Sequence, residues 1–154
     1  MNRIAIVGNA GGGKTTLAHA LGDRLGIPVH EVDRVQFRAD WSRAPTGEVQ
    51  HVLDGWVAED AWIVDGFGPW PAIERRLAAA DTIVWIDLPL RTHLWRALKK
   101  RDRPSRRLMV RMVLHVHTRY RRTIERALAP HAGKVVRLRS PRAVREFASR
   151  APTR

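Results

Sequence analysis

A glycine-rich segment near the start of the chain carries the residues with the clearest chemical meaning. Gly8, Gly13, Lys14 and Thr15 match the spacing G-x-x-x-x-G-K-[ST] of a phosphate-binding loop. Glycines let backbone N–H groups converge on an anion, because no side chain blocks the approach. In such a loop the lysine reaches the outer phosphates and the hydroxyl ligates Mg²⁺. The sequence therefore predicts a site for a triphosphate and a magnesium ion.

The flanking sequence supports this interpretation. Apolar residues 4–7 precede the loop, and Leu17, Leu21 and Leu25 follow it at helical spacing, as in a strand–loop–helix unit. The rival dinucleotide fingerprint G-x-G-x-x-G fits less well, because Thr16 stands where its last glycine belongs. A chance cluster of glycines in a strand-to-helix turn is the remaining alternative.

The rest of the chain alternates strand-like and helix-like patterns. This alternation predicts an α/β domain, spanning residues 1–154, in which a five-stranded parallel sheet is covered by helices on both faces. We expect strands at residues 4–7, 28–32, 62–64, 82–86 and 134–138. We expect helices at residues 46–58, 70–80, 92–101 and 106–128, and a last helix that Ser140 caps and Pro141 begins.

Ligands of open parallel sheets bind beyond the carboxyl ends of the strands, so the residues at these ends are candidates for chemistry. Asp65 is the favoured carboxylate for Mg²⁺, because Gly66 after it lets the backbone turn close to a nucleotide. Asp87 is the second candidate. Asp33 could hold a substrate hydroxyl and accept its proton, or could be an ordinary turn residue.

Positive charge is concentrated in the second half of the chain. Residues 1–90 contain 8 Lys/Arg and 12 Asp/Glu, whereas residues 91–154 contain 20 Lys/Arg and 3 Asp/Glu. This asymmetry predicts a polyanionic partner: either a triphosphate under an arginine-lined lid near residues 99–107, or a nucleic acid. Solvated basic helices are the alternative. Within the long helix, three arginines would form one stripe: Arg119, Arg122 and Arg126.

Composition excludes several classes of protein. The sequence has no cysteine, which rules out disulfides and thiolate metal sites. No apolar run is long enough to cross a bilayer, and no signal-peptide pattern opens the sequence. We therefore expect a cytoplasmic protein with no membrane partner.

The order of these motifs resembles the adenylate-kinase-related P-loop proteins, the superfamily of nucleoside monophosphate, shikimate and gluconate kinases. The chain is most similar to small bacterial adenylate-kinase-like proteins called DNA topology modulation proteins. The resemblance rests on the phosphate loop with residues 27–33, 62–67, 80–89 and 96–101. It implies a three-layer P-loop NTPase fold of the nucleoside monophosphate kinase type, with a short arginine-rich lid at about residues 99–122.

The resemblance also implies roles for individual residues. Arg96, together with Lys100 or Arg101, matches the basic residues that open the lid of adenylate kinases, and Arg139 begins the segment that packs against adenine. Mg²⁺ would lie near Thr15 and Asp65. The implied catalytic residues are Lys14, Asp33, Asp65, Arg96 and Arg122. The implied ATP-binding residues are Gly8, Asn9, Ala10, Gly11, Gly12, Gly13, Lys14, Thr15, Thr16 and Arg139.

The acceptor side departs from adenylate kinases. Their Asp-Gly-Phe-Pro-Arg motif grips the acceptor phosphate with its arginine, but here Gly68 and Pro69 follow Phe67. Gln50 and His51 stand where a second acceptor arginine belongs. These differences point away from AMP. We expect a kinase that transfers the γ-phosphate of ATP to a small molecule of unassigned identity; the alternative is a nucleic-acid-associated ATPase of the DNA topology modulation type.

Overall fold

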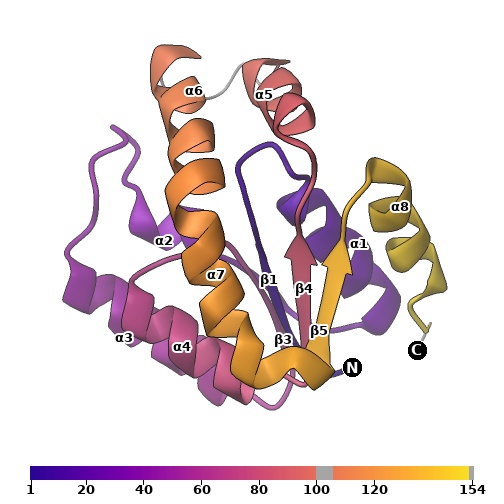
Figure 1. Cartoon of the computed structure of the whole chain (residues 1–154). Helices are drawn as coiled ribbons and strands as arrows, with labels where there is room; N and C mark the ends of the chain where they lie inside the picture. Colours follow the sequence, from indigo (N-terminus) through magenta and orange to yellow (C-terminus); the bar gives the residue numbers. More distant parts are fainter. Residues whose placement is uncertain (100–105, 153–154) are drawn as a thin grey trace.

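Five short segments pair into one parallel sheet in the computed structural model, which describes residues 1–99 and 106–152 (Figure 1). The strands are β1 (Arg3–Gly8), β2 (Val29–Glu31), β3 (Trp62–Asp65), β4 (Thr82–Ile86) and β5 (Val135–Leu138). Their order across the sheet is β2-β3-β1-β4-β5. β1 lies at the centre, and every residue of β1 after Arg3 is buried, as expected of a parallel strand covered on both faces.

The register of the central strands brings their carboxyl ends to one edge of the sheet. Ile6 of β1 pairs with Asp65 of β3, and Gly8 pairs with Ile86 of β4. The loop that follows Gly8 therefore begins beside Asp65 and Asp87, and the predicted gathering of strand-end residues is confirmed for these positions.

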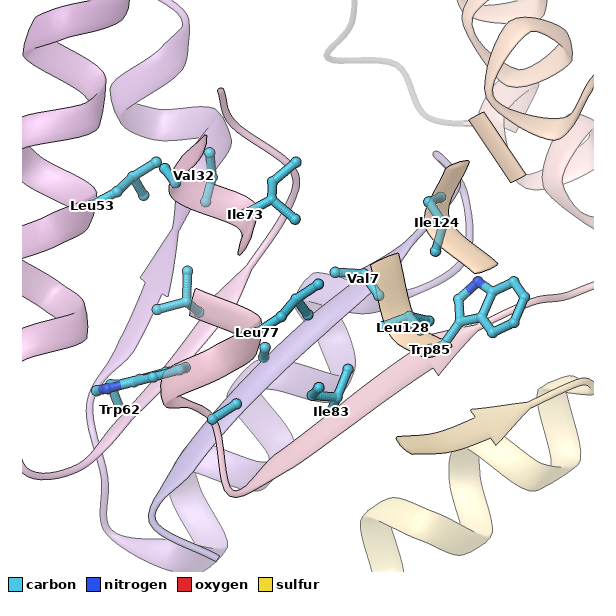
Figure 2. Packing of buried hydrophobic residues seen from close by; sticks show 14 of the residues in the cluster. Val7, Val32, Leu53, Trp62, Ile73, Leu77, Ile83, Trp85, Ile124 and Leu128 are labelled. Atoms are coloured by element: carbon cyan, nitrogen blue, oxygen red, sulfur yellow. The ribbon is translucent and has the colours of Figure 1, made fainter. Parts of the chain in front are cut away.

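Helices cover both faces of the sheet and complete a three-layer fold. One face carries α3 (Thr46–Ala58), α4 (Trp70–Ala79) and α7 (Arg121–Leu128), and the other carries α1 (Lys14–Leu25) and α8 (Pro141–Arg150). The first face buries one cluster that includes Leu53, Leu77 and Ile124 together with the fully buried Trp62, and Ile124 lies toward Trp85 (Figure 2). The second face packs Leu17 and Leu21 of α1 against the sheet. The α/β class with a five-stranded parallel sheet is thus confirmed.

The remaining helices lie where the strands of the sheet end or where they begin (Figure 1). Their bounds are α2 (Val32–Gln36), α5 (Leu90–Lys99), α6 (Arg106–His115) and a 3₁₀ helix (Ala129–Lys134). Between α6 and α7 the chain forms a π-helix, Val116–Tyr120, so the expected helix over residues 106–128 is continuous but not α-helical throughout.

Other differences from the expected elements are local. Val32 and Asp33 belong to the helix α2 rather than to the end of a strand. Thr46 begins α3 but makes no capping bond, whereas Ser140 caps α8 by accepting a 3.1 Å bond from the N–H of Ala143, as predicted. α5 begins two residues earlier than expected. Residues 100–105, including the candidates Lys100 and Arg101, lie outside the described residues.

No described helix combines the length and the apolar character that crossing a bilayer requires.

Candidate functional site

The glycine-rich loop has the backbone conformation that the phosphate-binding pattern predicts. Gly11 and Gly13 adopt positive φ angles of 71° and 86°, a region that side-chain-bearing residues rarely occupy. Gly8 is required for a second reason. A Cβ atom at this position would lie 2.5 Å from the carbonyl oxygen of Ile86, which is too close. The loop therefore depends on glycine both for its turns and for its contact with β4.

Two side chains at the end of the loop make hydrogen bonds, one to a neighbouring strand and one within the loop. The hydroxyl of Thr15, in the first turn of α1, donates a 2.6 Å hydrogen bond to Oδ2 of Asp65 at the end of β3. Lys14 Nζ donates a 3.3 Å bond back to the carbonyl oxygen of Asn9 at the start of the loop. The ammonium group is thereby held over the loop, where a phosphate would be neutralised.

Asp65 is buried, with 4% of its surface exposed. Burial raises the pKa of its carboxyl, and the nearby Asp33 raises it further, while Lys14 and the bond from Thr15 act in the opposite direction. Its Oδ1 atom is buried and accepts no hydrogen bond within the described structure. Burying a charged carboxylate with one unbonded oxygen costs free energy. A positively charged ligand bound to that oxygen would reduce the cost.

The Mg²⁺ ion that the loop implies fits these residues. A threonine hydroxyl and a carboxylate with an open oxygen are hard oxygen ligands, which Mg²⁺ prefers, and it commonly uses only one or two protein ligands beside phosphate and water. Thr15 and Asp65 are the residues that would hold it.

Arg76 of α4 is a buried cation that the sequence analysis did not single out. Its Nη2 donates a 2.6 Å hydrogen bond to the carbonyl oxygen of Gly66, directly after Asp65. Burial lowers the pKa of Arg76 to about 10, with Asp65 opposing the shift. The guanidinium remains charged at neutral pH and holds the turn after β3. Arg75 is the same type of residue and stands next to it in the sequence. Only the helical periodicity could have indicated that Arg76, rather than Arg75, faces inward.

Two helices of the carboxyl edge make hydrogen bonds to the loop. His93 of α5 is 1% exposed, and its Nδ1 lies 2.9 Å from the carbonyl oxygen of Ala10. A carbonyl oxygen only accepts, so Nδ1 carries the proton and donates this bond, and burial lowers the pKa of His93. Asn9 donates from Nδ2 to the carbonyl oxygen of Val113 on α6 at 2.8 Å. The loop is thus tied to both helices that flank residues 100–105, and no motif had indicated His93.

Arg96 contacts the loop, while the catalytic role that the resemblance implies for it stays a prediction. Its Nη1 donates a 3.4 Å bond to the carbonyl oxygen of Gly12. Arg96 also lines a groove of about 860 Å³ that runs from the loop along α1, α5 and α8. Lys14, Thr15 and Thr16 line the loop end of this groove, and Pro141 and Val144 line its far side. A groove that begins at a phosphate loop and continues over apolar side chains suits a nucleotide, with its base beyond its phosphates.

An exposed aromatic ring borders the groove. Trp95 is 59% exposed, and the ammonium of Lys99 lies 3.9 Å from the centre of its ring. Two other tryptophans lie away from this groove. Trp41 contacts Phe37, and Trp70 begins α4. Trp95 is therefore the tryptophan placed to contact a bound base.

The other predicted residues differ in their surroundings. Asp33 is exposed in the first turn of α2, near enough to Asp65 to influence its pKa. Arg122 is exposed on α7, and no described contact links it to the loop, so its role stays a prediction. Arg139 is exposed after β5 and lines a hollow other than the groove, so its contact with adenine stays a prediction.

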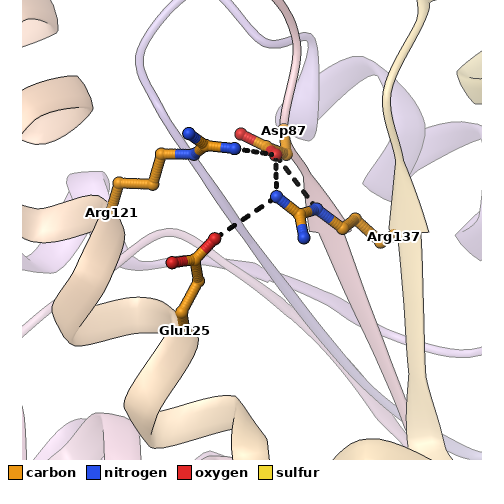
Figure 3. Close-up of polar contacts among 4 residues, drawn as sticks. All are labelled: Asp87, Arg121, Glu125 and Arg137. Carbon is orange, nitrogen blue, oxygen red and sulfur yellow. Dashed lines mark hydrogen bonds and ion pairs between the residues drawn. The ribbon is translucent and has the colours of Figure 1, made fainter.

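Asp87 is engaged by two arginines, not by the phosphate loop (Figure 3). Its Oδ2 atom accepts bonds from Nη2 of Arg121 at 3.1 Å and from Nε and Nη2 of Arg137 at 3.0 and 2.5 Å. Arg137 also contacts Glu125 at 3.3 Å. Burial acts to raise the pKa of Asp87, but these arginine bonds prevail and lower it below the usual value. The second candidate for a metal ligand is thus a partner of arginines.

The π-helix explains why Arg121, and not an arginine of the predicted stripe, contacts Asp87. The stripe of Arg119, Arg122 and Arg126 assumed uninterrupted α-helical spacing, but Arg119 lies within the π segment. A π turn shifts the helical register of the residues around it. All three stripe residues are exposed, and Arg121 reaches Asp87 instead. The exposure of the three arginines agrees with the alternative of a solvated basic face.

The fold and the loop geometry together define a P-loop protein with the α/β fold of small-molecule kinases. The chain belongs to the ATPase family associated with various cellular activities (AAA), whose model matches residues 4–87, more than half of the sequence. The matched span contains the loop, Asp65 and Asp87. A comparison with curated protein sequences finds no match.

Solved structures with the same fold include three bacterial shikimate kinases. The enzyme from Acinetobacter baumannii in complex with shikimate has a TM-score of 0.66 at 18% identity, covering 97% of this chain and 89% of that one. The enzyme from Aquifex aeolicus has a TM-score of 0.64 at 20% identity, covering 94% and 92%. That from Bacteroides thetaiotaomicron has a TM-score of 0.57 at 14% identity, covering 97% and 95%.

At these identities the likeness concerns the fold. It confirms the P-loop kinase architecture that the sequence predicts. The finer resemblance to DNA topology modulation proteins, a nucleic-acid partner and a cytoplasmic location stay predictions.

Proposed function

We propose that the chain is an ATP-dependent phosphotransferase that moves the γ-phosphate of ATP to a small-molecule acceptor. The observation that carries the proposal is the bond between Thr15 and Asp65, which joins the phosphate loop to a buried carboxylate with one open oxygen. The likeness in fold to shikimate kinases, one of them solved in complex with shikimate, supports it.

The binding of the triphosphate falls to the loop and its neighbours. Backbone N–H groups between Gly8 and Lys14 and the N-terminus of α1 attract the phosphate oxygens. Lys14 and Arg96 add positive charge at the two sides of the loop. When bound, Mg²⁺ supplies neutralisation of the charge that develops on the transferred phosphoryl group. Thr15 and Asp65 would hold the ion.

The acceptor is assigned to the side of Asp65 that faces Asp33. Asp33 is exposed and in electrostatic contact with Asp65, so it is available to a ligand that enters from solvent. A carboxylate in this position orients an acceptor hydroxyl and takes its proton as the phosphoryl group arrives. The acceptor class proposed is therefore a small molecule with a hydroxyl group rather than a nucleoside monophosphate.

A transfer assay with labelled ATP tests this function. The full chain is incubated with Mg²⁺ and γ-labelled ATP against a panel of hydroxyl acceptors that includes shikimate, gluconate and nucleosides, and labelled products are separated from inorganic phosphate. We expect a labelled organic product with one acceptor class, and its loss in Asp33→Asn. Release of inorganic phosphate alone, stimulated by DNA or RNA, would instead favour the nucleic-acid-associated ATPase.

A further inference from the structure

A second basic hollow lies beside the phosphate loop and is separate from the nucleotide groove. It has a volume of about 460 Å³ and is lined by Asp87, Leu88, Pro89, Leu90, His117, Arg121, Arg137 and Arg139. None of these residues lines the groove of α1, α5 and α8. The hollow opens at the carboxyl edge of β4 and β5, where ligands of parallel sheets bind.

Three arginines line this hollow. Arg137 belongs to β5 and Arg139 follows directly after the strand, while Leu138 between them is buried. Arg121 comes from the first turn of α7. Only one carboxylate, that of Asp87, lines the hollow with them, so the lining carries excess positive charge.

Asp87 orients the side chains of Arg121 and Arg137 but does not bond all of their N–H groups. Every described bond to Asp87 from Arg121 and Arg137 ends on the same oxygen, Oδ2 (Figure 3). Nε of Arg121 is buried and has no partner in the described structure. The guanidinium of Arg137 lies 4.0 Å from the centre of the Trp85 ring, which fixes its plane. The result is a pair of oriented guanidinium groups with N–H donors left over.

The π-helix is a second observation at the same place. The segment Val116–Tyr120 contributes His117 to the hollow and directly precedes Arg121. π segments are rare and occur frequently at functional sites, since they cost regular hydrogen bonding and persist where a side chain must be re-aimed. Here the re-aimed side chain is Arg121.

We propose that this hollow binds a small metabolite through a phosphate or carboxylate group, as a site distinct from the phosphate loop. The N–H groups of Arg121 and Arg137 that do not bond Asp87 or Glu125, together with the guanidinium of Arg139, would donate to the oxygens of such a group. A volume of about 460 Å³ exceeds that of a bare ion and suits a small organic anion, whose carbon part would lie on Leu88, Pro89 and Leu90. The inference does not depend on phosphotransfer, because it concerns arginines that the loop does not use.

Calorimetric titration of the full chain tests the site with two probes, inorganic pyrophosphate and citrate. Pyrophosphate should occupy two sites, the loop and the hollow, whereas citrate should occupy the hollow alone. Arg139→Glu should weaken citrate binding and the second pyrophosphate site at least tenfold, through loss of charge-assisted hydrogen bonds. Arg111→Glu, which reverses one exposed charge on α6 outside the hollow, is the matched control and should keep both sites.

Lys14→Ala separates the two claims. This variant should lose the pyrophosphate site of the loop and keep citrate binding, so failure of the loop and failure of the hollow give different results. Preference for pyrophosphate over citrate at the second site would assign it to phosphate, and the reverse preference to carboxylate. Equal binding of both probes by Arg139→Glu and Arg111→Glu would overturn the proposal, and so would a hollow that retained RNA but neither small anion.

Discussion

The hydroxyl of Thr15 donates a 2.6 Å hydrogen bond to Oδ2 of Asp65 across two elements that are far apart in the sequence. This bond connects the first turn of α1 to the end of β3, and it satisfies one oxygen of a buried carboxylate while the other stays open. The pair is the point at which the phosphate loop, the proposed Mg²⁺ site and the proposed acceptor side meet.

Thr15→Val should selectively reduce the effect of Mg²⁺ on nucleotide binding. Valine keeps the shape of threonine but removes the hydroxyl, so ATP would still meet the loop without one of the proposed ligands of Mg²⁺. We expect the gain in ATP affinity that Mg²⁺ provides to fall about tenfold, roughly the value of one charge-assisted contact. Calorimetry with and without Mg²⁺ measures it. Thr46→Val, at the exposed start of α3, is the control, and an equal effect of both substitutions would contradict the assignment.

Arg76→Met should destabilise the fold far more than Arg75→Met. Arg76 is buried and holds the carbonyl oxygen of Gly66, so its loss leaves Asp65 as a buried charge with less compensation. We expect a loss of about 3 kcal/mol in the free energy of unfolding. Arg75 forms an exposed ion pair with Asp54, for which about 0.2–1 kcal/mol is expected. Urea unfolding measures both, and similar losses would show that Arg76 has no special role.

Gly8→Ala should be strongly destabilising, whereas Gly55→Ala should not. A methyl group at Gly8 would lie 2.5 Å from the backbone oxygen of Ile86, and this oxygen belongs to the central sheet and cannot move away. We expect a loss of more than about 2 kcal/mol in the free energy of unfolding. Gly55 lies inside α3 with open space around it, so alanine there should stabilise by about 0.5–1 kcal/mol. In thermal unfolding, we expect the unfolding temperature of Gly8→Ala to fall and that of Gly55→Ala to rise.

Asp87→Asn should remove a stabilisation that depends on pH. The arginine bonds lower the folded-state pKa of Asp87 below its unfolded value of 3.8, so the stabilisation is present above that value and is lost as pH falls through the folded pKa. At neutral pH the variant should be less stable by about 1–2 kcal/mol, for charge-assisted bonds that are partly exposed. The difference between the two proteins should shrink below about pH 4 as the carboxyl becomes protonated. A difference that stayed constant down to pH 3 would contradict this account.

Much of the fold could be predicted because its signals are local. The apolar strands, the glycine loop and the capping serine Ser140 each act through neighbours in the sequence, and the structure confirms them. The gathering of Asp65 beside the loop also follows, since parallel strands present their carboxyl ends at one edge.

The rest of the site depends on contacts between distant residues. His93 meets Ala10, and Arg76 meets the turn after Asp65, only after the helices have packed. Arg121 is aimed by a π turn, for which the sequence carries no recognised signal. The role of Arg122 stays a prediction. Asp87 is a candidate metal ligand in the sequence because it follows an apolar strand, and its bond to Arg137, fifty residues away, is seen only in the folded chain.

Titration of ATP into the wild-type chain and into Lys14→Ala, each with Mg²⁺, tests the central claim most directly. We expect the wild type to bind one ATP in the groove that begins at the loop. The variant should bind at least tenfold more weakly and should unfold at the same temperature without ligand. Lys14 is bonded only to a backbone oxygen of its own loop in the described structure, so its removal should spare the fold. Equal affinity of the two proteins for ATP would contradict the account.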